Sequence, residues 1–543
     1  MKHSIKCGTK CDVRRMGAFL LAGVLLCTAA SCGVPGGVQP DGREEQTQES
    51  IGQGDALSPV SGNAAAQAEK ASQGRNSLLF PYVTMETIRG SYTAKDGETV
   101  LGEVARDNVV LDYAASGTGA YQKGAATVER LFSATQEAVD EEARMLGTDA
   151  VDQYEAMKQE AYGYFSPYSE WETYTIARLD RRVLSLQVAF YEYVGGVHGY
   201  GGTRGVTIDL LSGTELSLAQ LAQDPTGFLN RTTEVILAEL DTRQEELFDG
   251  YTQYVMDNLE QVSWYLDAVG IEFAFTPYEI GPYASGTIVV CVPYEQVAEF
   301  MKPEYVGIQE MGIAHVPAER AVSLSYMSKG EQGTFSYRYE YPGQYETDLV
   351  LSLDAEQASL GDVYMDQCYL IDSPDEKLYL LYDVDMASDD YVTYLYDLTD
   401  GALTEGASVA AKLDGKNMGV DWVNLKFSLY VLGTYSSEMK YLITADGALV
   451  GTEDRFEVPY HSAWNQLKLV RDLPVTMEGV ETVLPAGSSI YIMATDNDSI
   501  AWFETVDGKQ SGEIHYERSE EDYLIYIDGL SEFDYFDSLP YVG

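Results

Sequence analysis

The stretch that decides the fold begins with LSLQVAFYEYVGGVHG (184–199), continues with DLLSGTELSL (209–218) and ends with FAFTPYEIGPYASGTIVVCVPY (273–294). Apolar and polar residues alternate over 184–191, and this period of two is typical of a half-buried strand. The glycine-rich end of the first segment predicts a sharp turn, because glycine adopts backbone angles that are closed to other residues. A returning strand over 206–210 and a hairpin turn at Ser212 and Gly213 are expected to follow.

The rest of the stretch mixes helix and strand. Apolar residues at helical spacing predict a helix over about 226–248. Alternation over 271–275 predicts another strand, and the almost wholly apolar run 287–292 is typical of a central strand. Pro293 fits the first turn of a short helix, which we expect to reach about residue 301. Together these elements predict an α+β domain.

Helical spacing also appears upstream, between residues 79 and 165. One set of apolar residues is spaced to pack along one face of a single long helix: Val128, Leu131, Phe132, Val139 and Leu146. We expect Gly147 to interrupt this helix, because glycine weakens helix interiors. A second helical piece is expected over 151–162.

Two pairs of motifs carry a resemblance to a known family. YEYVGGVHG followed by DLLSGTELSL, and FTPYEIGPYASG followed by CVPY, resemble the domain of unknown function that RsiV-type anti-sigma factors share with PdaC-type peptidoglycan deacetylases. The resemblance covers about residues 78–305 and implies an extracytoplasmic α+β module of mixed sheet with packed helices. Some members of that family bind lysozyme, whereas others lie beside a separate deacetylase domain, whose sequence we do not find in this chain.

The N-terminus has the order of a lipoprotein signal peptide. Five basic residues precede an apolar run over 16–27, and the small residues 29–31 stand directly before Cys32. This order resembles a bacterial lipobox; an ordinary secretory signal with an incidental cysteine is the alternative. We therefore expect residues 1–31 to be removed and Cys32 to carry a lipid that anchors the chain on the extracytoplasmic face of the cell membrane. Residues 32–77 have the composition of a flexible tether.

The chain is strongly acidic, with a net charge of −51. Nucleic acid is excluded as a partner, because its phosphates require basic side chains. The acidity has two interpretations: it keeps an exported protein soluble, or its field attracts a cationic partner such as lysozyme. After export, two thiols would remain besides Cys32. We expect Cys291 to lie in a buried core, and a disulfide between Cys291 and Cys368 is the alternative.

Beyond residue 305 the pattern changes to strands and turns, so the C-terminal half is expected to be all-β. Over 306–460, Asp400–Gly401 and Asp446–Gly447 predict hairpin turns, and a small β-sandwich and a propeller-like fragment fit equally well. Residues 461–543 resemble bacterial SH3-like barrels, which often attach to cell-wall material; a barrel used only for packing is the alternative. Four cues carry this second resemblance: the turn 484–487, the strand 490–493, Trp502–Phe503 and the turn Asp507–Gly508.

No residue pattern points to catalysis or to a cofactor. The sequence has no G-x-S-x-G elbow, H-E-x-x-H pair or Walker loop. His198 has no adjacent acid, so a structural role is favoured over that of a base or a ligand. Two groups of aspartates offer the oxygen ligands that calcium prefers, although solvated turns are the better interpretation: Asp496 with Asp498, and Asp385 with Asp389 and Asp390. We expect no enzymatic activity, no metal and no cofactor.

The loop 276–286 is the candidate ligand-binding segment. It holds two prolines, two tyrosines and two glycines. Proline and glycine fix its path, and tyrosines offer large amphipathic surfaces at low entropic cost. The alternative is a rigid turn whose tyrosines pack inward. The candidate residues are Pro277, Tyr278, Glu279, Pro282 and Tyr283.

Three functions are compatible with these features. The first is a lipid-anchored envelope protein that binds a cationic protein such as lysozyme, or cell-wall glycan. The second is a cell-wall-active enzyme or an accessory subunit of a glycan-modifying enzyme, which the lack of a convergent nucleophile, base or metal set disfavours. The third is a sensor like the anti-sigma relatives, which needs a spanning helix and a cytoplasmic segment that we do not expect here.

The lipid anchor can be tested by one substitution. Cys32→Ala should move the protein from the membrane fraction to the medium, or leave it unprocessed, because the acceptor thiol is lost. Fractionation of cells followed by immunoblotting measures this change. Normal cleavage with unchanged membrane retention would exclude lipidation at Cys32.

Overall fold

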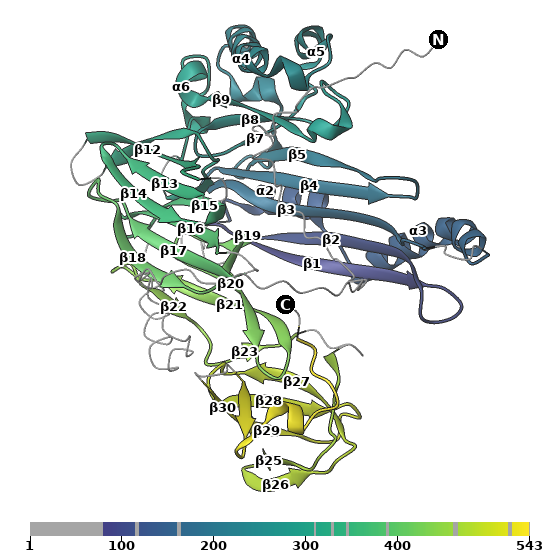
Figure 1. Ribbon diagram of the computed structural model, residues 1–543. Helices are drawn as coiled ribbons and strands as arrows, with labels where there is room; N and C mark the ends of the chain where they lie inside the picture. Colours follow the sequence, from purple (N-terminus) through teal and green to yellow (C-terminus); the bar gives the residue numbers. More distant parts are fainter. Residues whose placement is uncertain are drawn as a thin grey trace, which may run out of the picture. The chain divides into compact units, whose positions relative to one another are not determined.

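The computed structural model describes most of the chain from residue 80 onward (Figure 1). The described residues are 80–113, 119–159, 164–308, 311–326, 331–343, 347–386, 390–459, 465–519 and 524–541. The predicted signal peptide, the lipidation site Cys32 and the tether 32–77 lie outside these residues. The predicted α+β class is confirmed, with mixed sheets and a few helices followed by a strand-rich C-terminal half.

The N-terminal strands belong to one large sheet. β1 (Tyr82–Thr93) and β2 (Val100–Asp112) form an antiparallel hairpin, and β2 pairs in parallel with β3 (Tyr168–Asp180). The sheet continues antiparallel through β4 (Val183–Tyr193) and β5 (Tyr200–Asp209), which confirms both strands predicted here. The short β6 (Thr214–Glu215) pairs with β5 across the predicted turn, where Gly213 has a φ of +70°.

Two helices, α2 (Gln122–Phe132) and α3 (Gln136–Met157), replace the single long helix predicted over 128–146. The chain breaks after α2, and the Thr135 side chain begins α3 by accepting a hydrogen bond from the amide of Ala138. Gly147 does not interrupt α3, so that prediction was wrong. A Cβ at Gly147 would come within 2.5 Å of the Tyr92 ring, and glycine therefore permits α3 to pack closely on the β1–β2 hairpin.

A segment with its own small sheet follows β6. Its helices are α4 (Pro225–Leu240), α5 (Tyr251–Asn258) and α6 (Tyr294–Val297), with 3₁₀ turns at Leu218–Leu221, Asp241–Glu246, Tyr283–Ser285 and Pro303–Tyr305. Its strands are β7 (Ser263–Leu266), β8 (Gly270–Phe275) and β9 (Ile288–Pro293), hydrogen-bonded in that order. Their apolar face packs with the helices in a separate core, which includes Phe228, Ile236, Ile271, Phe273, Val290 and Val297.

Three expectations for this segment need correction. The apolar run 287–292 forms β9, which is an edge strand, and β8 is the central one. β9 is apolar because both of its faces are covered: Val290 belongs to the core with α4, and Cys291 to a core under the β-rich half. The helix predicted over 226–248 ends at Leu240 and continues as a 3₁₀ turn. The helix after Pro293 has only 4 residues. Cys291 and Cys368 are both buried and both free, so the disulfide alternative is excluded.

The large sheet runs across the boundary expected between residues 305 and 306. β10 (Gly312–His315) pairs with β3 on one side and with β15 (Tyr364–Asp372) on the other. The continuing strands are β16 (Leu378–Asp385), β17 (Tyr391–Asp397), β18 (Thr404–Val409), β19 (Lys412–Met418), β20 (Trp422–Tyr430), β21 (Thr434–Ile443) and β22 (Leu449–Gly451). Their order in the sheet is β18-β17-β16-β15-β10-β3-β2-β1-β19-β20-β21-β22. Backbone hydrogen bonds of β10 therefore join the two halves.

The other strands form smaller sheets. β11 (Ala321–Tyr326), β12 (Glu331–Glu340), β13 (Asp348–Leu353) and β14 (Glu356–Gly361) make a four-stranded sheet. A seven-stranded sheet holds β23 (Phe456–Glu457), β24 (Leu467–Lys468), β25 (Leu473–Met477), β26 (Val480–Leu484), β27 (Ser489–Thr495), β28 (Ile500–Thr505) and β29 (Ser511–His515). A three-stranded sheet holds β30 (Glu517–Arg518), β31 (Ile525–Ile527) and β32 (Leu530–Ser531), and a 3₁₀ turn at Glu532–Asp534 follows it.

The hairpin turns of the C-terminal half were predicted well. Gly401, Gly447 and Gly508 have φ values of +70°, +80° and +68°, and each lies between two antiparallel neighbours. Glycine adopts these angles without strain, which is why the Asp-Gly pairs marked the turns. The SH3-like resemblance of residues 461–543 stays a prediction.

Two side chains of β19 fasten this strand to the N-terminal hairpin. Lys416 Nζ lies 2.9 and 2.7 Å from the two carboxylate oxygens of Asp107 and 3.1 Å from Thr87 Oγ1. The Asn417 side chain donates to the carbonyl of Met85 (3.0 Å) and accepts from its amide (2.7 Å), as a neighbouring strand would. Because Asp107 is only 2% exposed, its charge depends on Lys416 for neutralisation.

Removing this cation should destabilise the whole sheet. Lys416→Met is expected to lower the free energy of unfolding by about 3–5 kcal/mol, since it leaves a buried carboxylate without its counter-ion. Urea denaturation measures the loss. Lys509→Met is the matched control, because the ion pair of Lys509 with Asp507 is exposed and should not contribute measurably. Equal effects of the two substitutions would show that Lys416 contributes no more than a surface lysine.

Candidate functional site

The hairpin of β4 and β5 ends in a turn over 194–199 that projects apolar side chains into solvent. Gly195 and Gly196 have φ values of +92° and +94°, which residues with a Cβ rarely adopt, so the two glycines make this turn possible. Val197 is 97% exposed and Val194 is 50% exposed. Neither valine contributes its full side chain to a core, and both are available for contact with another molecule.

An aromatic pair lies beside this turn. A Cβ on Gly199 would come within 2.4 Å of the Tyr191 ring, and a Cβ on Gly201 within 3.1 Å, so these two glycines, one in the turn and one in β5, leave room for the ring. Trp171 of β3, the cross-strand partner of Tyr191, stacks on it with 5.6 Å between ring centroids and 21° between planes. Burial raises the pKa of the Tyr191 hydroxyl, and the nearby Tyr283 raises it further.

The loop 276–286 is held rigidly by the side chain of Glu279. One carboxylate oxygen accepts a hydrogen bond from the Thr276 amide (2.5 Å), and the other accepts from the Tyr254 hydroxyl of α5 (2.7 Å). Burial, together with the Glu279 charge, raises the pKa of Tyr254 well above its usual range. The Tyr278 amide donates to the carbonyl of Gly281 (2.9 Å) and closes a tight turn in which Tyr278 has a φ of +75°.

A stacked pair of rings joins the loop to the β4–β5 turn. The rings of His198 and Tyr283 lie 4.2 Å apart, with 25° between their planes. Tyr278 lies next to Tyr283 at 6.0 Å, and the Tyr200 hydroxyl donates to Thr276 Oγ1 (3.4 Å). His198 Nδ1 donates to the carbonyl of Gly199 (2.9 Å), which fixes the orientation of the imidazole. We call the resulting patch the aromatic surface; it consists of Trp171, Tyr191, His198, Tyr200, Tyr278 and Tyr283.

The five candidate residues of the loop divide into two groups. Tyr278 is 56% exposed, Pro282 is exposed and Tyr283 is half-buried, so these three belong to the outside of the loop. Pro277 is buried and Glu279 is engaged within the loop, so both support it from behind. The alternative in which the tyrosines pack inward is wrong for Tyr278 and only partly right for Tyr283.

The sequence interpretation missed the other half of the aromatic surface. The structural role favoured for His198 stays a prediction; its exposed ring stacks on the candidate Tyr283, a contact that the sequence did not indicate. Tyr191 and Trp171 were not singled out, because alternation in a strand does not show which exposed face gathers aromatic rings. The repeated glycines opposite Tyr191 were the available signal, since they leave space for a large ring.

The two aspartate groups are the possible metal sites that the sequence offers. The described residues contain no group of three or more His, Cys, Asp or Glu side chains placed to hold a metal ion. Asp496 Oδ1 accepts hydrogen bonds from the amides of Asp498, Ser499 and Ile500, as expected of a carboxylate that closes a turn. Asp389 lies outside the described residues, so the second aspartate group is not complete.

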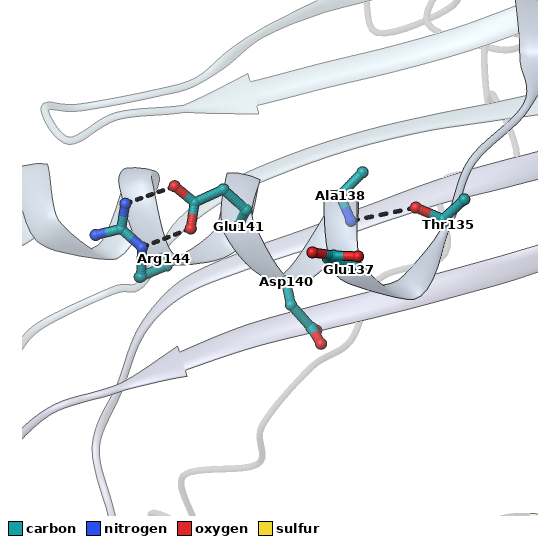
Figure 2. A pocket seen from close by; sticks show the side chains of 6 residues that line it. All are labelled: Thr135, Glu137, Ala138, Asp140, Glu141 and Arg144. Atoms are coloured by element: carbon teal, nitrogen blue, oxygen red, sulfur yellow. Dashed lines mark hydrogen bonds and ion pairs between the residues drawn. The ribbon is translucent and has the colours of Figure 1, made fainter.

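A shallow hollow on α3 is a poor candidate site (Figure 2). Its lining comes from the N-cap and first turns of one helix: Thr135, Glu137, Ala138, Asp140, Glu141 and Arg144. Arg144 is engaged by Glu141 through two hydrogen bonds of 2.7 and 2.6 Å. No side chains converge on it from a second element, in contrast to the aromatic surface.

In the part of the chain that the structure describes, no helix is both long and apolar enough to cross a membrane.

Comparisons with known proteins identify one domain. Residues 221–295 match the family described as "Protein of unknown function (DUF3298)". A solved DUF3298 member from Bacteroides fragilis is 20% identical, with a TM-score of 0.31, and the alignment covers 40% of this chain and 94% of that structure. A DUF3298 protein from Pseudomonas aeruginosa is 14% identical, with a TM-score of 0.29, over 43% of this chain and all of that structure. No curated protein matches the chain significantly.

The matched range begins at the end of the first 3₁₀ turn and includes α4, α5, the small sheet and the loop 276–286. The β4–β5 turn precedes this range, so the aromatic surface is built only partly from the matched residues. The two solved structures are too distant to carry a conclusion about function. The narrower resemblance to RsiV-type and PdaC-type proteins stays a prediction. Residues 221–295 of this chain are therefore similar to the DUF3298 domain, a family of unknown function.

Proposed function

We propose that this chain is a binding protein of the bacterial cell envelope, and that its aromatic surface holds a cationic protein partner. The observation that carries the proposal is the stack of His198 on Tyr283, which joins the β4–β5 turn to the loop 276–286. Two segments that are distant in sequence thus present aromatic and apolar side chains in one place. A patch of this kind on a protein surface is typical of an interaction site.

The way the rings are held favours tight recognition. Tyrosine anchors a partner well when its own side chain is already ordered, because little conformational entropy is then lost on binding. Glu279 orders the loop through Thr276 and Tyr254, and His198 covers one face of Tyr283. The exposed Tyr278 and Val197 then lie at the outer limit of an ordered surface, where a partner can contact them first.

Charge favours a cationic partner over a neutral one. With a net charge of −51, the chain attracts basic proteins and increases their rate of encounter, most strongly at low salt. Lysine and arginine side chains also bind favourably over the faces of tyrosine rings. Lysozyme is such a basic protein, and the resemblance of the 78–305 region implies it as a ligand. A lipid on Cys32 and a flexible tether would place the surface outside the membrane, where such partners occur.

The proposal predicts that two tyrosines act as anchors. Replacement of Tyr278 and Tyr283 by Ala should weaken binding to lysozyme by about 1–3 kcal/mol, because anchors in a desolvated patch carry most of the binding energy. Titration calorimetry at moderate salt measures the affinity, and circular dichroism verifies the fold. The matched control replaces Tyr341 and Tyr364, which are 58% and 54% exposed elsewhere on the chain, and should bind as the wild type does.

Two outcomes would contradict the proposal. Weak binding that is equal in all variants and disappears at a few tenths molar salt, where exposed charges are screened, would leave only nonspecific attraction. Binding to soluble cell-wall glycan fragments, but not to lysozyme, would replace the cationic protein by a carbohydrate as the ligand of the same surface.

A further inference from the structure

One face of the small sheet carries polar side chains into the interior. Tyr265 of β7, Glu272 of β8 and Cys291 of β9 form one cross-strand row, because Glu272 pairs in register with both neighbours. The exposed fraction is 6% for Tyr265, 3% for Glu272 and 1% for Cys291. A glutamate in the middle of a buried row is costly unless a partner compensates its charge.

Asp267 lies diagonally across from Glu272, in the turn that joins β7 and β8. Diagonal neighbours in an antiparallel pair are about 7–8 Å apart and on the same face, within reach of a glutamate side chain. Asp267 is fully buried, and its Oδ1 accepts hydrogen bonds from the amides of Val269 (2.7 Å) and Gly270 (2.9 Å). Among the described residues, no donor reaches Oδ2 of Asp267 or Oε1 of Glu272.

Two adjacent carboxylates cannot both stay ionised in a dry interior, because each loses its hydration and the two charges repel each other. A single proton removes both penalties: the acid that holds it donates a strong hydrogen bond to the other carboxylate. The electrostatics agree with this geometry. Burial raises the pKa of Asp267 well above its usual range, and the Glu272 charge raises it further; burial also raises the pKa of Glu272.

The described groups around the pair do not supply a free cation in place of the proton. Arg320 donates to Glu239 at 2.7 Å, and burial raises the pKa of Glu272 by more than the Arg320 charge lowers it. Arg178 donates to the Tyr294 hydroxyl at 3.1 Å and is held by its own carboxylate, Asp180. The Tyr294 hydroxyl in turn donates to the backbone carbonyl of Asp267 (3.1 Å) and not to the Asp267 side chain.

The remaining titratable neighbours are neutral near pH 7. Burial raises the pKa of the Tyr265 hydroxyl and of the Cys291 thiol, so both keep their protons. His315 contacts the turn through its carbonyl, which accepts from the Ala268 amide at 3.0 Å. Burial lowers the pKa of the His315 imidazole to about 4.

The acid pair lies where the small sheet meets the β-rich half. Cys291 and Val269 belong to the same core as Val316 and Leu324, which follow in the β-rich half. The opposite face of the small sheet packs with α4 and its neighbours. Charge that appears at Asp267 and Glu272 would therefore act on the contact between these two parts.

We propose that Asp267 and Glu272 share a single proton and form a pH-sensitive joint between the β7–β9 sheet and the β-rich half. The joint is firm while the proton is held and loosens when the proton leaves. In the unfolded chain both acids ionise near pH 4, so above that pH the folded pair binds one proton more than the unfolded chain. The stabilisation is therefore complete at low pH and is lost as the pH rises, until the folded pair itself deprotonates.

The joint can be tested in the full chain with Glu272→Gln. The glutamine amide can donate to the Asp267 carboxylate, so the hydrogen bond is kept without a titratable proton. Hydrogen exchange of the β8 and β9 amides is measured in both proteins at each pH from about 5 to 9. The opening constant of the wild type, divided by that of the variant, should rise with pH. The rise should reach about tenfold per pH unit over the range in which the folded pair keeps its proton. Glu260→Gln, at an exposed position next to β7, is the control and should follow the wild type.

Infrared spectroscopy supplies a readout that does not depend on stability. At pH 7 the wild type should show the carbonyl band of a protonated carboxyl group that is weaker in Glu272→Gln. The difference spectrum is needed because burial raises the pKa of Asp383 to about 8, and Asp383 therefore contributes to the same band. An unchanged band, or an identical pH profile of exchange in wild type and variant, would overturn the proposal. Loss of the wild-type profile on adding a chelator would point to a bound cation in place of the proton.

Discussion

The buried guanidinium of Arg178 makes the contacts on which the relative placement of the large sheet and the segment of the small β7–β9 sheet depends. Its Nε donates to Asp180 Oδ2 (2.8 Å), and Nη2 lies 2.7 Å from the same oxygen in an ion pair. Its Nη1 donates to the Tyr294 hydroxyl and to the carbonyl of Tyr305 (3.1 and 2.8 Å). Asp180 Oδ1 accepts from the amides of Arg182 and Val183, where β4 begins. One charge network thus joins β3 to the start of β4 and to Tyr294 of α6. Of these elements, β4 leads to the β4–β5 turn of the aromatic surface.

Buried charge is used in two different ways in this fold. Arg178 with Asp180, and Lys416 with Asp107, are pairs of opposite charge. Lys416 joins β19 to β2, and Arg178, which is paired with Asp180 within β3, reaches Tyr294 and Tyr305 in the segment after β9. Asp267 and Glu272 are like charges, which are compatible with burial only in one protonation state. The first kind of contact sets the architecture at every physiological pH. The second kind makes the contact between the small sheet and the β-rich half depend on pH.

Sequence periodicity predicted the strands and turns that local backbone geometry determines. β4, β5 and the Asp-Gly turns were predicted because alternation and glycine act over a few residues. The continuity of the sheet past residue 305 was not predicted, since it depends on the pairing of β10 with β3, in which Ile313 lies opposite the sequence-distant Leu179. The candidate site was predicted only in part for the same reason. The loop 276–286 was predicted from its composition. His198 of the β4–β5 turn contacts this loop only by stacking on Tyr283, and residue spacing in the sequence does not indicate that contact.

The aromatic surface and the acid pair are linked by chain connectivity. The loop 276–286 runs from the end of β8 to the start of β9, and Glu272 and Cys291 pair across the same two strands. The loop is ordered through Glu279 at one end of these strands, while the shared proton compensates charge at the other. A loosened β8–β9 pair would give the tyrosines more freedom, and a partner would then have to restrict that freedom on binding. The rigidity that makes the aromatic surface suitable for recognition therefore depends on the same small sheet that buries Asp267 and Glu272, and these two acids can stay buried only while they hold a proton.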